Sequence, residues 1–419
     1  EIRFCDWSSD VCSSDLELAI RKLTEETAAQ FHKDVAALGC LPPSVEPRAT
    51  EYIAEMREMI TRLYEANVAY VAEEHVLFSV AAYGELKDVP RYGSLANRSL
   101  DEMIAGARVE VAPYKRDAMD FVLWKPSKGG EPAWPSPLNI RTPGRPGWHL
   151  ECSAMSEAIL GDEFDIHGGG IDLMFPHHEN EVAQSCGANK TRKMANVWMH
   201  NGFLQVEGQK MSKSLGNFFT INELLNTTNF NGQWRGDDLR LAMLMTHYRQ
   251  PIDFTTEKLL EARALLRNYR LAIRGFDPKR TQASPAVLTA LSDDLNTPEA
   301  RVELDQLAKV ARSGDSEGKA TVKAKKQLIW ALKLLGFEDF VAKYTKETLE
   351  RDMAAEAAEK GIDAAQIESS IEARLDARRL KDWAEADRIR DELVAQGIII
   401  KDAKDPATGE IITTWEIAR

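Results

Sequence analysis

Cysteine is scarce in this chain, and its scarcity excludes a fold held together by disulfides. The 419 residues contain five cysteines, an odd number, and two of them lie among the first dozen residues. Disulfide-stabilised secreted folds need a denser and even set of cysteines. We therefore expect a cytoplasmic protein whose cysteines serve packing, metal binding or chemistry.

The sequence also lacks long apolar runs and an excess of positive charge. No apolar run approaches the roughly 20 residues that span a membrane, and the N-terminal residues lack the apolar core of a signal peptide. The net charge of −13 argues against a protein that coats nucleic acid. It leaves room for a local basic patch that binds nucleic acid. With 44% hydrophobic residues, the chain is long enough for two or three domains.

Residue types that bind metals gather between Gly147 and Asn217. His177 and Glu181 are four apart after Pro176, which suits a first helical turn, so their side chains should share one helix face. With Cys152 they make up the ligand types that zinc takes. A solvated helix face or a packed cysteine would explain each piece alone. Their combination favours a metal site.

Two further motifs in this segment suit a ligand that carries phosphates. The apolar run Phe164–Ile166 predicts a buried strand, and His167 with the glycines 168–170 follows it. A glycine triplet after a strand allows close approach of the backbone to a ligand. The string KMSKS occupies 210–214, where two lysines on a mobile loop would suit a polyphosphate. A solvated loop is the alternative interpretation of that string, and the neighbouring motifs disfavour it.

The segment closely resembles the cysteinyl-tRNA synthetases, which are class I aminoacyl-tRNA synthetases. Residues 210–214 match the second signature of the class. The strings GWHLECSAM and HGGGIDLMFPHHENE resemble sequences that are specific to this family and one close relative. The resemblance runs from about Glu17 to the C-terminus. It implies a cysteine–tRNA ligase, expected to be a monomer, that activates L-cysteine with ATP and Mg²⁺. The product, cysteinyl-adenylate, would then pass its cysteinyl group to tRNA(Cys).

The resemblance implies a metal-binding role for three residues. Cys152, His177 and Glu181 match three of the family's four zinc ligands, with one Zn²⁺ per subunit. Pocket size alone separates cysteine from serine weakly. Zinc prefers a thiolate to a hydroxyl, so it would select the substrate through its sulfur.

Other residues would bind the two small substrates. Lys213, supported by Lys210, is expected to stabilise the charge that develops on the polyphosphate. Gly168, Gly169 and Gly170 are expected to join Lys213 in binding ATP. Trp148 and His167 resemble positions near the side chain of the substrate cysteine. The alternatives are core packing for Trp148 and, for His167, a hydrogen bond that orients a ligand.

The C-terminal part carries the residues that we expect to read tRNA. The helix near 374–379 is locally basic. Arginine pairs with guanine edges, aspartate accepts from cytosine and an aromatic ring stacks on an unpaired base. Arg378, Trp383, Asp387 and Asp402 are therefore candidate anticodon contacts. The alternative is an ordinary charged helix whose tryptophan lies in a core.

The order of the patterns predicts an α/β fold followed by all-α structure. The α/β part would be the C-terminal half of a Rossmann-like, doubly wound parallel sheet that carries an insertion, and a helical bundle and a small α+β anticodon-binding unit would follow. We expect a non-native or disordered leader at 1–16, and a remnant of the first nucleotide-binding half with its connective insertion at 17–143. The second half, with the zinc site and the lysine loop, would occupy 144–217. A linking helical segment at 218–255, the bundle at 256–363 and the anticodon-binding unit at 364–419 would complete the chain.

The sequence departs from the family pattern in two ways. It contains no H-x-G-H signature, and the family's first zinc-binding cysteine is absent. We therefore expect a truncated synthetase that is inactive as written. Two alternatives stay open. One is a ligase that joins cysteine to an amino-sugar, which the anticodon-type unit disfavours. The other is a non-catalytic fragment that binds zinc or tRNA.

Overall fold

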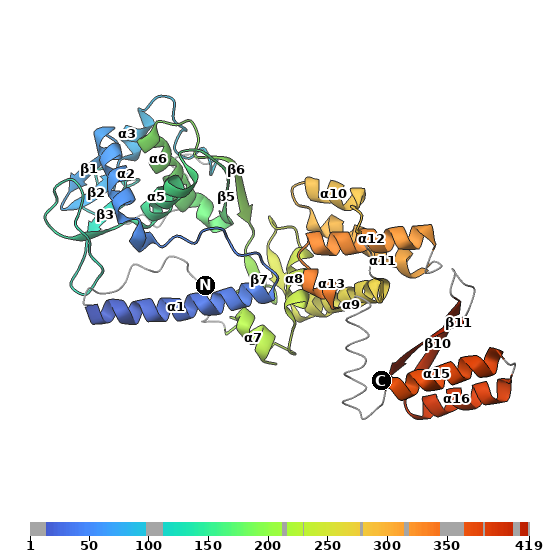
Figure 1. Ribbon diagram of the computed structural model, residues 1–419. Helices are drawn as coiled ribbons and strands as arrows, with labels where there is room; N and C mark the ends of the chain where they lie inside the picture. The colour runs from blue at the N-terminus through green and yellow to red at the C-terminus, as the bar shows by residue number, and fades with distance from the viewer. Residues whose placement is uncertain are drawn as a thin grey trace. The chain divides into compact units, whose positions relative to one another are not determined.

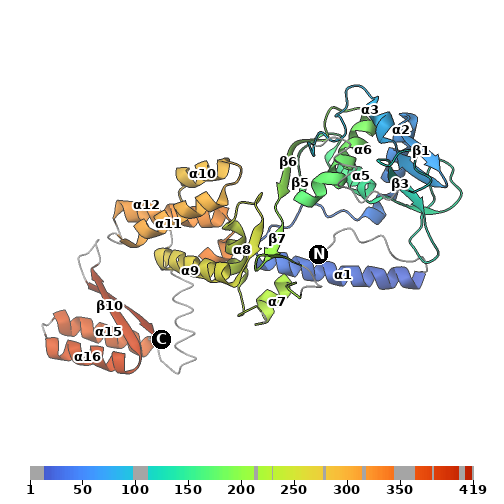
Figure 2. The ribbon, with the colours of Figure 1, turned by 180° about the vertical axis from the view of Figure 1, so that it is seen from behind.

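The computed structural model describes residues 14–97, 112–211, 216–228, 230–276, 280–313, 318–343, 364–379, 382–404 and 411–417. The chain forms two compact units (Figures 1 and 2). The first unit contains residues up to Trp234 together with Thr246–Thr256, and the second contains the remainder. No helix within the described ranges is both long and apolar enough to cross a membrane.

The first unit begins with helices and an antiparallel sheet. α1 (Ser14–Ala37), a short 3₁₀ turn η1 (Ala49–Glu51) and α2 (Ile53–Glu65) precede the sheet, whose strand order is β1-β2-β3-β4. The strands are β1 (Ala69–Ala72), β2 (His75–Phe78), β3 (Phe121–Pro126) and β4 (Gly144–Pro146), and the short α3 (Val80–Gly84) follows β2. α2 buries Met56, Met59, Ile60 and Leu63, whose spacing places them on one face. These side chains form the core of this part with Phe78, Leu123 and Trp124.

The following segment alternates helix and strand, as the sequence predicts. α5 (Trp148–Leu160) leads to β5 (Phe164–Gly170), and two short turns, η2 (Ile171–Leu173) and η3 (Met174–His178), connect β5 to α6 (Glu179–Asn189). β6 (Ala195–Asn201) then pairs with β5 in parallel. This β–α–β arrangement carries the candidate site, and Figure 1 shows α5 and α6 beside the two strands.

The glycine triplet lies within β5, which corrects the expectation that it follows the strand. Gly168, Gly169 and Gly170 continue β5 and align with Met199, His200 and Asn201 of β6. A run of glycines has no strand propensity of its own. Parallel pairing with β6 supplies the order that the local sequence does not predict.

The first unit ends with a small mixed sheet. β7 (Leu204–Val206) pairs in antiparallel with β8 (Gln209–Lys210) and in parallel with β9 (Ile252–Phe254). Glu207 and Gly208 both have positive φ, which suits the tight turn between β7 and β8. A capping box begins α7 (Ile221–Asn226), where the Glu223 amide donates to Thr220 Oγ1 at 3.1 Å.

The second unit begins with a helical bundle. Its helices are α8 (Gly236–Leu244), α9 (Thr256–Ile273), α10 (Pro285–Ser292), α11 (Thr297–Ser313), α12 (Lys319–Leu334) and α13 (Glu338–Ala342). The Asn296 side chain caps α11 by accepting from the Glu299 amide at 3.1 Å. Leu259, Leu266, Leu304, Leu328 and Leu332 are buried within the bundle.

Residues 364–417 form a terminal module of two helices and a hairpin. α15 (Ala364–Arg379) and α16 (Trp383–Ala395) are followed by the antiparallel strands β10 (Ile398–Lys404) and β11 (Ile411–Ile417). The Asp382 side chain caps the second helix, α16, by accepting from the Glu385 amide at 3.1 Å.

Candidate functional site

Three predicted ligands meet where α5, η3 and α6 come together. Cys152 lies in the second turn of α5, His177 in η3 and Glu181 in the first turn of α6. One ligand atom from each lies within 4.8 Å of the others. Cys152 is half-buried, whereas His177 and Glu181 are buried. The fold therefore brings the Cys152 thiol beside an imidazole and a carboxylate, although Cys152 lies 25 residues before His177 in the sequence.

Glu181 is the centre of this group. Its side chain is 1% exposed, and its two oxygens lie 2.5 Å from His177 Nε2 and 3.1 Å from His167 Nε2. Burial alone would raise the pKa of this carboxyl group, but its contacts with His167 and His177 outweigh burial and lower the pKa to about 2. A buried carboxylate that stays ionised is a strong attractor for a cation.

A second group of potential ligands shares the same carboxylate. His167, His178 and Glu181 also place ligand atoms within 4.8 Å of one another. His167 comes from the middle of β5 and His178 from the end of η3. Both groups include Glu181, so a single cation could bind this carboxylate in either of two neighbouring positions.

The site contains histidines that the sequence analysis did not single out. His149 Nδ1 lies 2.7 Å from His177 Nδ1, and His178 Nδ1 lies 2.9 Å from His200 Nε2. Burial and, to a lesser extent, His177 lower the pKa of His149 to about 3, and burial is the main cause that lowers the pKa of His178 to about 4. Both imidazoles are therefore neutral at pH 7 and can orient or ligate. The adjacent pair at 177–178 was the one sequence signal for this cluster.

Trp148 lies against the candidate ligand group formed by Cys152, His177 and Glu181. Its ring centroid is 4.3 Å from that of His177 and 5.6 Å from that of His149. The residue is 44% exposed, which excludes the core-packing alternative. Trp148 therefore forms a wall of the site that solvent or a ligand can reach.

Two glycines of the triplet are explained by contacts inside the site. A Cβ atom on Gly169 would lie 2.8 Å from His178 Cε1, and one on Gly170 would overlap Asp172 Oδ1. Gly168 is less restricted, since its nearest neighbour would be the Met199 carbonyl oxygen at 3.6 Å. The close approach at Gly169 thus involves a histidine of the cluster, and its expected contact with ATP stays a prediction.

The lysine loop is described only at its start. Lys210 ends β8, where it aligns with Gln205. Lys213 belongs to 212–215, which lie outside the described residues. The roles that the resemblance implies for Lys210 and Lys213 stay predictions.

Two of the candidate anticodon residues bind each other in the terminal module. Asp402 accepts from Arg374 Nη1 and Nη2, both at 2.9 Å, from Thr413 Oγ1 at 2.6 Å, and from Arg378. The Arg374 hydrogen bonds are the main cause that holds the pKa of Asp402 far below its usual range. Asp402 therefore ties α15 to both strands of the hairpin, and its proposed pairing with a base would compete with these contacts.

The other two candidates lie on α16 and face solvent. Trp383 is 58% exposed, which excludes the alternative that its ring belongs to a core. Asp387 is exposed and forms an ion pair with Arg390 at 3.0 Å. An exposed aromatic ring at the start of a helix is available for stacking on a base.

Comparison with known proteins agrees with this arrangement. A family model described as the catalytic domain of tRNA synthetases class I (C) matches residues 12–264, and one described as the cysteinyl-tRNA ligase anticodon binding domain matches residues 364–407. Among curated proteins, a cysteine–tRNA ligase of Rhodopseudomonas palustris strain TIE-1 is 58% identical over 96% of this chain and 82% of its own length. Cysteine–tRNA ligases of Bradyrhizobium sp. strain BTAi1 and Brucella canis are 57% and 52% identical, over 96% and 95% of this chain and 81% and 80% of theirs.

Proposed function

The chain belongs to the cysteinyl-tRNA ligases, a family of class I tRNA synthetases, and we propose that its site serves the joining of L-cysteine to tRNA(Cys) at the expense of ATP. The expectation that the 419 residues are inactive as written stays a prediction. The observation that carries this proposal is the meeting of Cys152, His177 and Glu181 in one site. The membership confirms the fold class and the family that the sequence predicts.

The donor set fits a zinc ion. Thiolate, imidazole and carboxylate are the ligand types of zinc, and the three ligand atoms lie close enough to share one ion. The Glu181 oxygens are buried, and His167 and His177 approach them without well-directed hydrogen bonds, which leaves lone pairs for a cation. His149 contacts the far ring nitrogen of His177 and would orient that ligand.

Different residues of the site would have different roles in selecting cysteine. A bound zinc ion would supply a thiophilic centre that prefers the sulfur of cysteine to the hydroxyl of serine. Cys152, His177 and Glu181 would hold that centre, and Trp148 would close the side of the site that remains exposed. His167, 3.1 Å from Glu181, would orient the carboxylate or, with His178, bind the ion itself.

Activation of cysteine needs a second set of groups. Lys213, with Lys210, would stabilise the negative charge that develops on the pyrophosphate as the carboxylate of cysteine attacks the α-phosphate. Mg²⁺ would accompany ATP, and the backbone at Gly168–Gly170 would lie beside the nucleotide. Because the polyphosphate needs positive charge rather than a protein nucleophile, two lysines suffice for this role.

The terminal module supports tRNA as the acceptor. It combines the exposed Trp383 with arginines near the end of α15. An amino-sugar acceptor would have no use for such a module, so tRNA(Cys) is the preferred partner. We further propose that the protein acts as a monomer in the cytoplasm, where cysteine, ATP and tRNA are available together.

Calorimetric titration of the two amino acids tests this proposal. L-Cysteine and L-serine would be titrated into the zinc-loaded chain and into chain treated with a chelator. We expect cysteine to bind the zinc-loaded chain at least about 100-fold more tightly than serine, and we expect removal of zinc to abolish this preference. Equal affinity for both amino acids, or cysteine binding that is indifferent to zinc, would contradict the proposal.

A further inference from the structure

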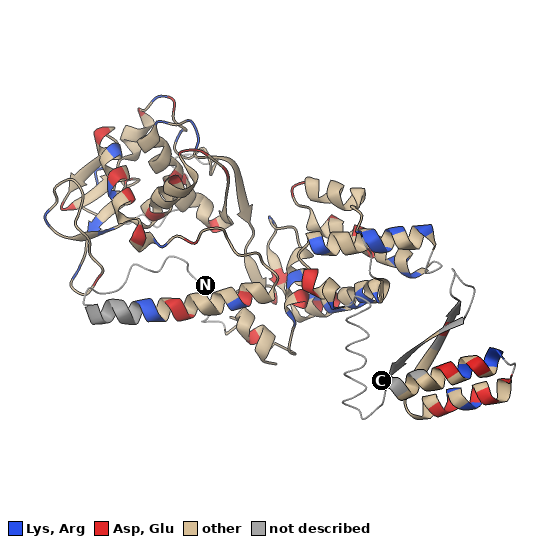
Figure 3. Ribbon diagram, in the orientation of Figure 1, with Lys and Arg blue, Asp and Glu red and all other residues tan. Residues whose placement is uncertain are grey.

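Only four of the carboxylates that the structure describes are buried. Acidic residues are spread over both units (Figure 3), and the buried ones are Asp120, Glu179, Glu181 and Asp238. Removing a carboxylate from water is costly unless other groups bind it. The partners of each buried carboxylate therefore indicate what it holds in place.

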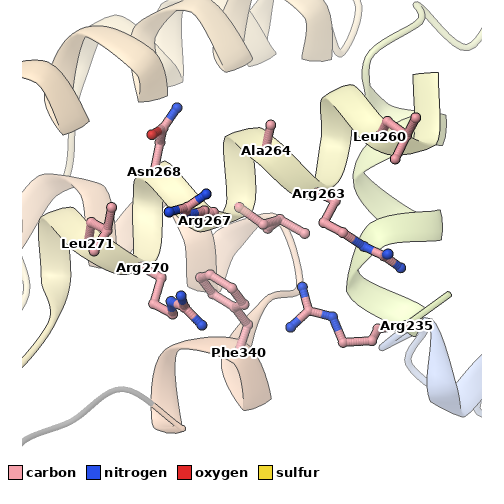
Figure 4. A pocket seen from close by; sticks show the side chains of 10 residues that line it. Arg235, Leu260, Arg263, Ala264, Arg267, Asn268, Arg270, Leu271 and Phe340 are labelled. Carbon is pink, nitrogen blue, oxygen red and sulfur yellow. The ribbon is translucent and has the colours of Figure 1, made fainter. Parts of the chain in front are cut away.

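Asp238 is a buried carboxylate that is bound by groups of opposite charge. It accepts from Arg263 Nη2 at 2.9 Å and from Arg235 Nη2 at 3.0 Å. Figure 4 shows both arginines beside a cavity of the helical bundle. Since Asp238 belongs to α8 and Arg263 to α9, this carboxylate joins two helices of the second unit.

Glu179, by contrast, is bound by main-chain amides of a segment distant in the sequence. Its Oε1 accepts from the Gly93 amide at 2.7 Å and its Oε2 from the Ala96 amide at 2.9 Å, and the Leu95 amide also binds it. Main-chain amides that converge on one point suit an anion. Because both of its oxygens are used, Glu179 fixes the path of residues 93–96 against the start of α6.

Two further contacts join this segment to α6. Tyr92 Oη donates to Asn180 Oδ1 at 2.5 Å, and both side chains are buried. Leu95 packs against a small apolar cluster that includes Val182 of α6. Residues 92–96, which we call the clamp loop, therefore contact the first turns of α6 through charged, polar and apolar groups.

The first turn of α6 is also where two of the candidate ligands need support. His177 lies in η3, in which Phe175 has non-helical φ and ψ, so a regular helix does not set its position. Glu179 follows His177 by two residues and precedes Glu181 by two. Side chains two apart on a helix point in directions that differ by about 200°. Glu179 therefore binds the clamp loop on one side of α6, while Glu181 faces the histidines on the other.

We propose that Glu179 is a positioning residue of the site formed by Cys152, His177 and Glu181. By binding the clamp loop it fixes the first turn of α6, and with it the placement of His177 and Glu181 that one zinc ion requires. Glu179 does not bind the ion itself. This inference rests on the proposed function, because it assigns a role toward the zinc ion of that site.

The variant Glu179→Gln tests this role with almost no change in size. Glutamine keeps one acceptor oxygen, but its NH₂ group would face an amide N–H that donates to the second oxygen of glutamate. We expect zinc affinity, measured by competition with a chromogenic chelator, to fall about tenfold or more. The visible spectrum of the Co²⁺-loaded chain should also change, because it depends on the arrangement of the ligands around the ion.

Glu157→Gln is the matched control for a loss of packing alone. Glu157 lies on α5 of the same unit, where it pairs with Arg62 at 2.6 Å and accepts from Asn189, the last residue of α6, at 3.0 Å. Its replacement should lower thermal stability but leave zinc affinity and the Co²⁺ spectrum unchanged. If Glu157→Gln weakened zinc binding as much as Glu179→Gln, the effect would be one of general stability and the inference would be wrong.

Tyr92→Phe keeps the test decisive if Glu179→Gln does not fold. This variant removes only the hydroxyl that binds Asn180, and we expect zinc affinity to fall about threefold. Unchanged zinc affinity in a folded Glu179→Gln, or in Tyr92→Phe where Glu179→Gln does not fold, would overturn the inference and leave the proposed function standing. Absence of zinc binding by the unsubstituted chain would overturn both.

Discussion

Glu181 keeps a negative charge in a fully buried position, and its neighbours make that charge tolerable. Its oxygens lie within 2.5 and 3.1 Å of two histidines, and Cys152 completes the group. Removing one partner of a buried charge usually costs more than the pair contributes. If the three residues bind zinc as proposed, they act as a unit, and a substitution at any of them should weaken zinc binding.

Replacement of Cys152 by serine exchanges one sulfur atom for oxygen and tests whether this side chain binds zinc. Serine keeps the shape but exchanges a thiolate for a hydroxyl, which zinc binds far less well. In Cys152→Ser we expect zinc affinity to fall by more than about tenfold. Inductively coupled plasma mass spectrometry after dialysis against a weak chelator would measure the bound zinc.

Cys40 provides the matched control. It is an exposed cysteine of the same unit, so Cys40→Ser should retain the zinc content of the unsubstituted chain. Full zinc retention in Cys152→Ser, with loss in His178→Ala, would instead favour the group formed by His167, His178 and Glu181.

The grouping of the three candidate ligands could be predicted from the sequence, whereas the residues around them could not. Cys152, His177 and Glu181 were recognisable because their residue types and the four-residue spacing reflect ligand chemistry and helix geometry. His149 and His200 reach the site only through tertiary packing of α5 and β6. No local pattern encodes such a contact.

Individual strands and helices also differ from what local sequence patterns predict. The sequence predicted the strand at 164–166 but placed the glycines after it in a loop, whereas β5 continues through Gly170 because β6 pairs with it. Pro176 was expected to open the helix, yet α6 begins at Glu179, and His177 lies in the preceding irregular turn. Pairing partners and irregular turns depend on residues distant in sequence, which local propensity does not capture.

The hairpin of the terminal module depends on an ion pair that a pH experiment can detect. Asp402 on β10 holds Arg374 and Arg378 of α15, chiefly through Arg374, and its pKa is lowered far below the usual 3.8. A lowered pKa means that the carboxylate stabilises the fold fully above pH 4, and that this contribution declines as the pH falls further. Asparagine cannot carry the charge. We expect Asp402→Asn to destabilise the module by about 1–2 kcal/mol near neutral pH, after allowance for solvent screening.

Hydrogen–deuterium exchange of the β10–β11 peptides measures this local stability. After correction for intrinsic rates, Asp402→Asn should exchange faster at pH 6, and the difference should shrink as the pH falls below 4. Asp387→Asn is the control, because the exposed Asp387–Arg390 pair should contribute almost nothing. Equal protection in the Asp402 variant at pH 6 would show that the hairpin is held by packing alone.

The whole molecule combines an acidic chain with a terminal module that we propose contacts tRNA. The net charge is −13, yet Arg378 and Arg379 lie in the last turn of α15. The group formed by Cys152, His177 and Glu181 lies in the other unit. On the proposed roles, substitutions in one unit should change amino-acid selection and substitutions in the other should change tRNA binding, so the two effects can be measured independently.

Zinc X-ray absorption spectroscopy tests the central claim most directly, because it counts the sulfur atoms around the ion. Spectra would be recorded for the zinc-loaded chain alone, with L-cysteine and with L-serine. One sulfur from Cys152 is expected in the free chain, a second on addition of cysteine, and no change with serine. A sulfur count that stays the same when cysteine is added would contradict the claim that this site recognises its substrate through the thiol.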